Sequence, residues 1–135
     1  MRYVLGIILL AVLGLMLFIR LAPTDPAQWH TALGAVEDAD GAGSAMRVLK
    51  ADASVLARAD AYMRSLPRTK AIAGSVEDRH ITYVTRSLVF GFPDYTTLQY
   101  SEAEGLFKAF ARLRFGKSDF GVNRERLDGL FAALQ

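Results

Sequence analysis

The chain opens on an uninterrupted apolar run. No charged side chain occurs from Tyr3 to Ile19, and two more apolar residues follow Arg20. A helix needs about 20 apolar residues to cross a bilayer, and an arginine near its end can reach the headgroups through its long side chain. The pattern therefore predicts a membrane-spanning helix over residues 1–22.

Two interpretations of this helix remain open, a cleaved signal peptide and a retained anchor. Cleavage requires small residues just before the cut. The candidate site here is Arg20-Leu21-Ala22 followed by Pro23. Arginine at the outer recognition position and proline after the cut both disfavour cleavage, so we expect a retained single-pass anchor.

The flanking charges predict the orientation of the anchor. Arg2 and the α-amine precede the apolar run, whereas Arg20 and then Asp25 follow it. Because positive charge is retained on the cytoplasmic side, this distribution favours a cytoplasmic N-terminus and a domain on the outer side.

Residues 23–45 are predicted to be a stalk followed by a flexible loop. Pro23 and Pro26 oppose a continuing helix and favour an extended chain. Trp29 has two interpretations, a place at the membrane interface or packing on the domain. The sequence GAVEDADGAGSA at residues 34–45 is typical of a loop.

The rest of the chain, residues 46–135, has the pattern of one α+β domain. Apolar positions recur at helical spacing in two segments and alternate or cluster in five others. The predicted helices cover residues 52–66 and 122–134, and the predicted strands cover residues 46–51, 69–76, 80–90, 95–101 and 106–115. Short connections predict a small antiparallel sheet of about five strands, with both helices packed on one face.

Alternation in the last two strands also predicts their register. Pairing Ser101 with Leu106 collects the apolar side chains of both strands on one face. The same register places Asp94 near Arg112 and Arg114.

Charge and composition exclude several classes of function. The chain has 16 Lys and Arg against 14 Asp and Glu. Two of the cations flank the apolar run, so the domain is neutral overall and no nucleic-acid partner is expected. With no cysteine and two histidines, His30 and His80, we predict no metal site, and no motif indicates a cofactor.

The sequence gives little evidence for a catalytic function. Hydrolysis would need a nucleophile and a base together, for example Ser118 with His80 and an acid, but Ser118 and His80 lie far apart along the chain. We predict no catalytic residues, and a protein that is not an enzyme is the preferred interpretation.

The polar stretch RFGKSDFGVNRERL at residues 114–127 carries the candidate site. Ser118 or Asp119 can cap the following helix, whereas Arg124 and Arg126 fall in its first turns, where the helix dipole disfavours cations. Either carboxylates compensate, as a network that fixes this corner, or an anionic ligand does. The predicted ligand-binding residues are Arg86, Asp94, Tyr95, Arg112, Arg114, Ser118, Asp119, Asn123, Arg124 and Arg126.

Two segments carry a resemblance to a known family. TYVTRSLVFGFPDYTT at residues 82–97 and RLRFGKSDFGVNRERL at residues 112–127 resemble family 1499 of the domains of unknown function, which groups bacterial envelope proteins with plastid relatives. The resemblance covers residues 23–135 and implies an anchored or secreted protein without an agreed activity. Ala111 departs from the hydroxyl residue that many relatives carry there.

Together these features predict a single-pass protein of the bacterial inner membrane with a periplasmic domain. Its expected role is to bind an anionic small molecule or an envelope protein through the Arg-rich strand-to-helix corner. The alternatives are a small hydrolase or transferase at the same corner, or a purely structural envelope component. A pocket around Asp94, Arg114 and Ser118 would favour a ligand or substrate, and an exposed apolar patch without a pocket would favour protein docking.

Overall fold

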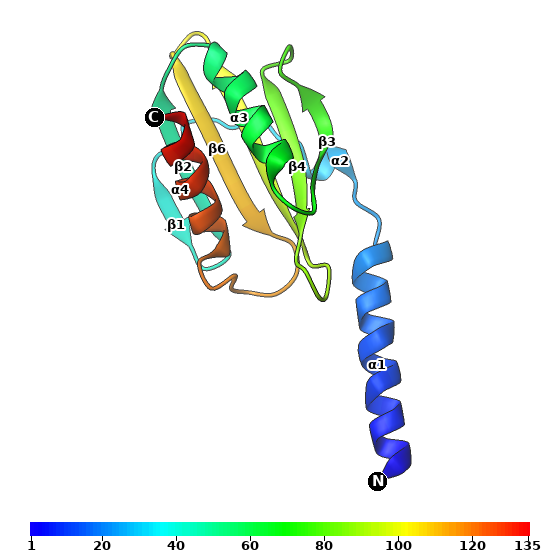
Figure 1. The fold of residues 1–135 in the computed structure, drawn as a ribbon. Coiled ribbons are helices and arrows are strands. Elements are labelled where there is room, and N and C mark those ends of the chain that lie inside the picture. Colours follow the sequence, from blue (N-terminus) through cyan, green and yellow to red (C-terminus); the bar gives the residue numbers. More distant parts are fainter.

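A computed structural model describes residues 1–135 as an α+β domain with a long N-terminal helix projecting from it (Figure 1). This helix, α1 (Arg2–Leu21), is long and apolar enough to span a membrane, and an N-terminal signal sequence meets the same criteria. Nearly all of its side chains are exposed.

The domain is built on one antiparallel sheet of six strands in the order β1-β2-β6-β5-β4-β3. The strands are β1 (Ala39–Gly41), β2 (Ser44–Lys50), β3 (Thr69–Ser75), β4 (His80–Arg86), β5 (Pro93–Ser101) and β6 (Leu106–Leu113). The predicted fold class is confirmed, with one strand more than expected.

Two helices cover one face of the sheet and close the core, as predicted (Figure 1). They are α3 (Ser54–Ser65) and α4 (Val122–Leu134). Asp52 accepts a hydrogen bond from the backbone N–H of Ser54 at 2.9 Å just before α3, whose N-cap residue is Ala53. The predicted stripe of α4 is buried: Leu127, Leu130, Phe131 and Leu134.

The predicted register of β5 and β6 is confirmed, because Ser101 pairs with Leu106. The expected proximity of the Asp94 side chain to Arg112 and Arg114 is wrong. Asp94 lies opposite Leu113, and since side chains alternate along a strand, it points to the helix-covered face while the two arginines point to the other face.

Several element boundaries also differ from the predictions. The loop expected at residues 34–45 contains β1 and the start of β2, and its acids support this hairpin. Asp38 accepts a hydrogen bond from the N–H of Val48 at 3.0 Å, and Asp40 forms a salt bridge with Arg47 at 2.8 Å. The strand expected over residues 80–90 ends at Arg86, because the chain turns through residues 87–92.

The opposite face of the sheet is covered by residues 23–34, which we call the strap. The strap contains the single-turn helix α2 (Pro26–Trp29). The Trp29 ring stacks on Tyr95 with ring centroids 4.1 Å apart, and Lys108 donates a hydrogen bond to the carbonyl of Gly34 at 2.7 Å. The segment predicted to be an extended stalk is therefore packed on the sheet, and Trp29 lies against the domain.

Candidate functional site: a pocket at the base of the sheet

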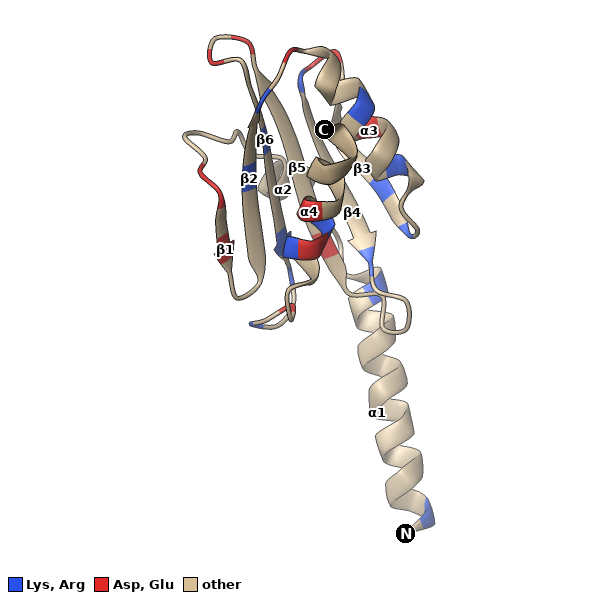
Figure 2. Ribbon diagram, turned by 60° about the vertical axis from the view of Figure 1, so that its left-hand side comes forward, with Lys and Arg blue, Asp and Glu red and all other residues tan.

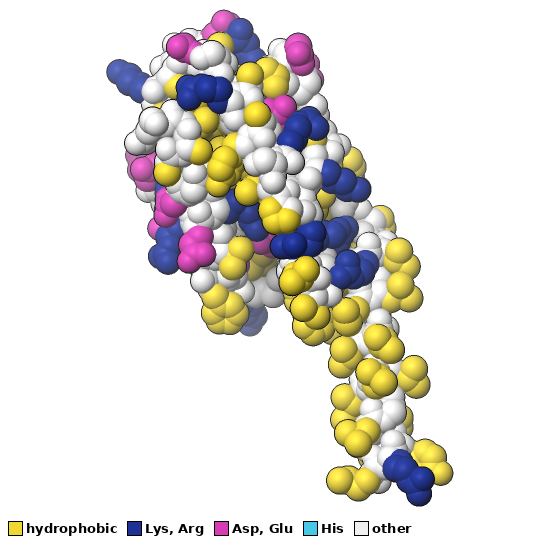
Figure 3. Space-filling model, in the orientation of Figure 1, with side chains coloured by type: hydrophobic (Ala, Val, Ile, Leu, Met, Phe, Trp, Pro, Cys, Tyr) yellow, Lys and Arg dark blue, Asp and Glu magenta, His cyan; other side chains and the backbone are white.

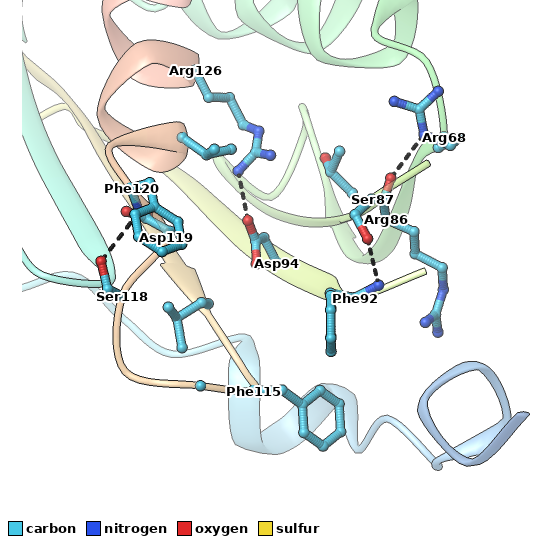
Figure 4. Close-up of a pocket in the computed structure, with 14 residues that line it drawn as sticks. Arg68, Arg86, Ser87, Phe92, Asp94, Phe115, Ser118, Asp119, Phe120 and Arg126 are labelled. Carbon is cyan, nitrogen blue, oxygen red and sulfur yellow. Dashed lines mark hydrogen bonds and ion pairs between the residues drawn. The ribbon is translucent and has the colours of Figure 1, made fainter. Parts of the chain in front are cut away.

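A pocket of about 550 Å³ lies at the end of the sheet nearest α1 (Figure 4). We call it the basal pocket. It is enclosed by the end of β4, the start of β5, the end of β6, the loop that follows β6, and the first turn of α4. Its polar lining is Arg68, Thr85, Arg86, Ser87, Asp94, Ser118, Asp119 and Arg126, and its apolar lining is Phe92, Leu113, Phe115, Phe120 and Val122.

A chain of polar contacts forms the wall next to α4. Asp94 and Arg126 face each other, with Oδ2 and Nη1 3.5 Å apart. The same guanidinium donates to the Oδ1 atom of Asn123, whose Nδ2 atom donates to Asp119 at 2.7 Å. Figure 2 shows acidic and basic positions side by side at this end of α4. Arg126 therefore has the acceptors that its unfavourable place near the helix N-terminus requires.

Asp119 performs the predicted capping role. Its carboxylate accepts hydrogen bonds from the backbone N–H groups of Gly121 at 2.9 Å and Asn123 at 3.1 Å. Gly121 has φ +82°, a left-handed conformation that favours glycine, and so allows the chain to enter the helix. Ser118 accepts from the N–H of Phe120 at 3.2 Å. Ser118 and Asp119 thus line the pocket and also shape the corner.

Of the two acids that line the basal pocket, Asp94 has fewer hydrogen-bond partners than Asp119. Its side chain is 15% exposed, and its one salt bridge is long at 3.5 Å. Burial raises the pKa of the Asp94 carboxyl above its ordinary value, and the attraction of Arg126 only partly offsets this effect. A buried carboxyl with a raised pKa on the wall of a pocket is typical of functional sites.

Arg68 and Arg86 form the opposite wall. Arg86 donates to the carbonyl of Gly91 at 2.9 Å, and the Nε atom of Arg68 donates to the carbonyl of Arg86 at 2.9 Å. Neither guanidinium lies within 4 Å of a carboxylate. Since a guanidinium carries five N–H donors, both arginines retain donors for an anion in the pocket.

Arg112 lies on the other face of the sheet, beneath the strap. The residue is 9% exposed, and its guanidinium donates to the hydroxyl of Thr97 at 2.8 Å and to the carbonyl of Trp29. It also lies over the Phe110 ring, 4.7 Å from the centroid. Burial lowers the pKa of Arg112 to about 10, and no carboxylate offsets it. Arg112 holds the strap on the sheet and does not reach the basal pocket.

Tyr95 and Arg114 join Arg112 on this second face. Arg114 donates to the carbonyl of Pro23 at 3.0 Å and to the hydroxyl of Tyr95 at 3.2 Å. Arg124 is exposed on α4, makes no hydrogen bond or salt bridge, and does not line the pocket. The structure therefore brings together Arg86, Asp94, Ser118, Asp119 and Arg126, with Asn123 behind them, and leaves the other predicted residues outside.

The structure separates the pair considered for nucleophilic catalysis. His80 begins β4, whereas the basal pocket lies at the other end of that strand, about 20 Å away at the rise of an extended chain. The His80 ring stacks on His30 with centroids 3.8 Å apart and hydrogen-bonds the carbonyl of Thr31 at 2.9 Å. Ser118 and His80 thus do not form one site. No group of three or more His, Asp or Glu side chains is placed to hold a metal ion.

Several residues of the basal pocket were not predicted from the sequence. Arg68 reaches the pocket because it follows Pro67 in a left-handed conformation, φ +54°, and its backbone bonds that of Arg86. The aromatic side chains Phe92, Phe115 and Phe120 line one pocket only because the loop before β5 and the loop after β6 meet. No pattern in the sequence predicts these contacts. The one indication of a place in the pocket was that Phe92 lies two positions before Asp94 in the GFPDY segment.

The long apolar helix and the small α+β domain, whose pocket is lined by arginines and aromatic side chains, define a structural class rather than an activity. The comparison with family models then identifies the family. The family described as "Protein of unknown function (DUF1499)" matches residues 19–134, and the chain belongs to it. A search of curated proteins finds no match.

Proposed function

We propose that this chain is a membrane-anchored envelope protein that binds an anionic ligand in the basal pocket and is not itself a catalyst. In this proposal α1 is a retained anchor in the bacterial inner membrane, and the domain lies in the periplasm. The apolar length of α1, the flanking charges and the family resemblance support this location.

The observation that carries the proposal is that three arginines line one pocket. Arg68 and Arg86 lack a carboxylate partner, and Arg126 has one long salt bridge at 3.5 Å. Guanidinium groups bind carboxylates and phosphates through paired hydrogen bonds. The volume of about 550 Å³ falls in the range of small-molecule sites.

The side chains that line the basal pocket indicate which class of ligand it would bind. Phe92, Phe115 and Phe120 line the same pocket as the arginines, so the proposed ligand is an anion that also carries an apolar part (Figure 4). The Asp94 carboxyl donates a hydrogen bond to an anion when it is protonated and repels the anion when it is ionised. Affinity is therefore expected to increase as the pH is lowered toward the raised pKa of Asp94.

Titration calorimetry on the full chain in lipid nanodiscs tests the proposal. The probes are hexyl phosphate, inorganic phosphate and hexanol, which separate the charged and apolar contributions. We expect hexyl phosphate to bind more tightly than either simpler probe. Arg126→Met should weaken its binding roughly tenfold or more, the effect of one charge-assisted hydrogen bond.

The matched control is Arg124→Met, since Arg124 lies two positions away on the same helix but is exposed and outside the pocket. It should leave the affinity unchanged. If the three probes bind equally, or if both variants lose the same affinity, the basal pocket is not an anion site.

A further inference from the structure

The exposed apolar side chains of the domain gather at one end. Outside α1, the large hydrophobic side chains with high exposure are Leu88, Val89, Phe90, Phe92, Phe120 and Val122. All of them belong to two segments, residues 87–92 and 120–122, which lie at the end of the domain nearest α1 (Figure 1). Leu88 is 71% exposed and Val89 is 62% exposed. A patch of this kind on an otherwise polar surface marks a place that another apolar surface covers.

The loop of residues 87–92 lies directly against the last turn of α1. Arg20 donates to the carbonyl of Val89 at 2.8 Å, and Arg86 approaches the carbonyl of Ile19 at 3.5 Å. A Cβ atom added at Gly91 would lie 2.8 Å from Cζ of Arg20, so the two segments are in close contact. The loop is thus held at the depth at which α1 ends.

Four cations that form no salt bridge lie beside this loop. A second cavity, of about 340 Å³, is lined by Arg20, Arg68, Lys70 and Arg86 together with Thr69 and Val84. None of the four cations lies within 4 Å of a carboxylate. In Figure 3 dark blue side chains gather where the domain meets α1, with hydrophobic side chains directly beneath them. Like charges held this close favour an anion between them.

We infer that this end of the domain rests on the bilayer that holds α1, with residues 87–92 in the apolar boundary and the four cations bound to phosphate headgroups of anionic phospholipids. A helix of 20 residues spans about 30 Å, the thickness of the hydrocarbon core, so Arg20 lies at headgroup level. The neighbouring cations then lie in the layer of lipid phosphates, where basic residues are attracted.

The occupant of the patch follows from its continuity with α1. Arg20 is exposed at the end of α1, but its guanidinium bonds the backbone of the loop, so the apolar side chains of α1 and of the loop lie on either side of it, at successive depths. The lipid that surrounds α1 is therefore expected to cover the loop of residues 87–92 as well. This inference rests on the proposed anchor but not on a ligand in the basal pocket.

Depth measurements with spin labels test the inference on the full chain. Because the chain contains no cysteine, single-cysteine variants can be labelled with a nitroxide without further changes. The variants are Val89→Cys, Leu10→Cys in the middle of α1, and Lys50→Cys, which is exposed at the end of β2 and four strands from β3 in the sheet. Collision rates with oxygen and with a water-soluble nickel chelate report lipid and water exposure.

In nanodiscs that contain phosphatidylglycerol, we expect the oxygen-to-nickel ratio at position 89 to exceed that at position 50 several-fold and to approach that at position 10. If position 10 is lipid-exposed and position 89 matches position 50, the inference is overturned while the anchor stands. If position 10 is also water-exposed, the anchor fails, and the inference fails with it.

A second arm tests the headgroup contact. The ratio at position 89 should fall when phosphatidylcholine replaces phosphatidylglycerol, and Lys70→Glu should remove this dependence. Lys50→Glu, an equal change of charge on a distant exposed lysine, should retain it. Arg68 and Arg86 line both cavities, but neither lysine lines the basal pocket, so the two lysine variants leave the lining of that pocket unchanged. A ratio that does not respond to lipid charge or to Lys70→Glu overturns the assignment of the cations to headgroups.

Discussion

The strap offers the sharpest test of the fold, through its single tryptophan. Trp29→Ala removes a ring that stacks on Tyr95 at 4.1 Å and lies under the guanidinium of Arg112 at 5.5 Å. The half-buried indole removes roughly 100 Å² from water, worth about 2.5 kcal/mol. The stacked pair adds about 1 kcal/mol and the cation–π contact about 0.5 kcal/mol. Because unfolded chains already bury part of this surface, the expected loss of unfolding free energy is about 3 kcal/mol.

Thermal unfolding of the full chain, followed by circular dichroism, measures this loss. A domain of this size changes its unfolding midpoint by about 4 °C per kcal/mol, so Trp29→Ala should lower the midpoint by about 12 °C. Gln28→Ala is the control, because Gln28 is an exposed neighbour on the same short helix and should change the midpoint by no more than about 2 °C. A Trp29→Ala midpoint within that range would refute the packed strap and favour a tryptophan in the membrane interface.

Three further predictions concern single side chains. The pKa of Asp94 is raised in the native state, so the native state binds a proton more strongly than the unfolded chain does. The free energy of unfolding therefore declines as the pH rises above about 4. Asp94→Asn should keep or raise the unfolding midpoint at neutral pH. Burial and His80 lower the pKa of His30, so stability should fall as pH decreases below about 6.5, and His30→Gln should flatten this dependence between about pH 7.5 and pH 5.5. Gly74→Ala should lower the midpoint sharply, because the new Cβ would lie 1.9 Å from the carbonyl oxygen of His80.

Each of these predictions has an outcome that contradicts it. A midpoint several degrees lower in Asp94→Asn would show that the carboxylate braces the corner. A native state equally stable at the two pH values, in both the wild type and His30→Gln, would show that the His30 environment does not disfavour its charge. A Gly74→Ala midpoint equal to that of the wild type would contradict the close backbone approach between β3 and β4.

Local patterns predicted the elements that depend on local contacts. The bounds of α4 follow from its apolar stripe and from Asp119 three positions before Val122, both visible in the sequence. The register of β5 and β6 follows from a short loop and alternating side chains. Each of these features depends on residues close together in the chain.

The features that escaped prediction depend on distant partners. Trp29 meets Tyr95 across the sheet, and two prolines gave the strap the pattern of a free stalk. Four of the ten predicted site residues lie outside the pocket, and three of them, Tyr95, Arg112 and Arg114, do so because β5 and β6 send adjacent residues to opposite faces. Asp94 therefore enters the basal pocket while Arg112 and Arg114 hold the strap. The sequence shows the charges of these residues, but the face to which each side chain points depends on the sheet.

The central claim is that the charges of the basal pocket serve a ligand rather than the fold. The double variant Asp94→Asn, Arg126→Met tests it directly, with the unfolding midpoint and the affinity for hexyl phosphate measured on the same sample. Replacing both members of a partly buried ion pair by neutral side chains of similar size is often neutral or stabilising. We therefore predict an unchanged or higher midpoint together with a loss of affinity of about tenfold or more. A midpoint that falls by several degrees while the affinity stays at the wild-type value would contradict the account and assign these residues to bracing the strand-to-helix corner.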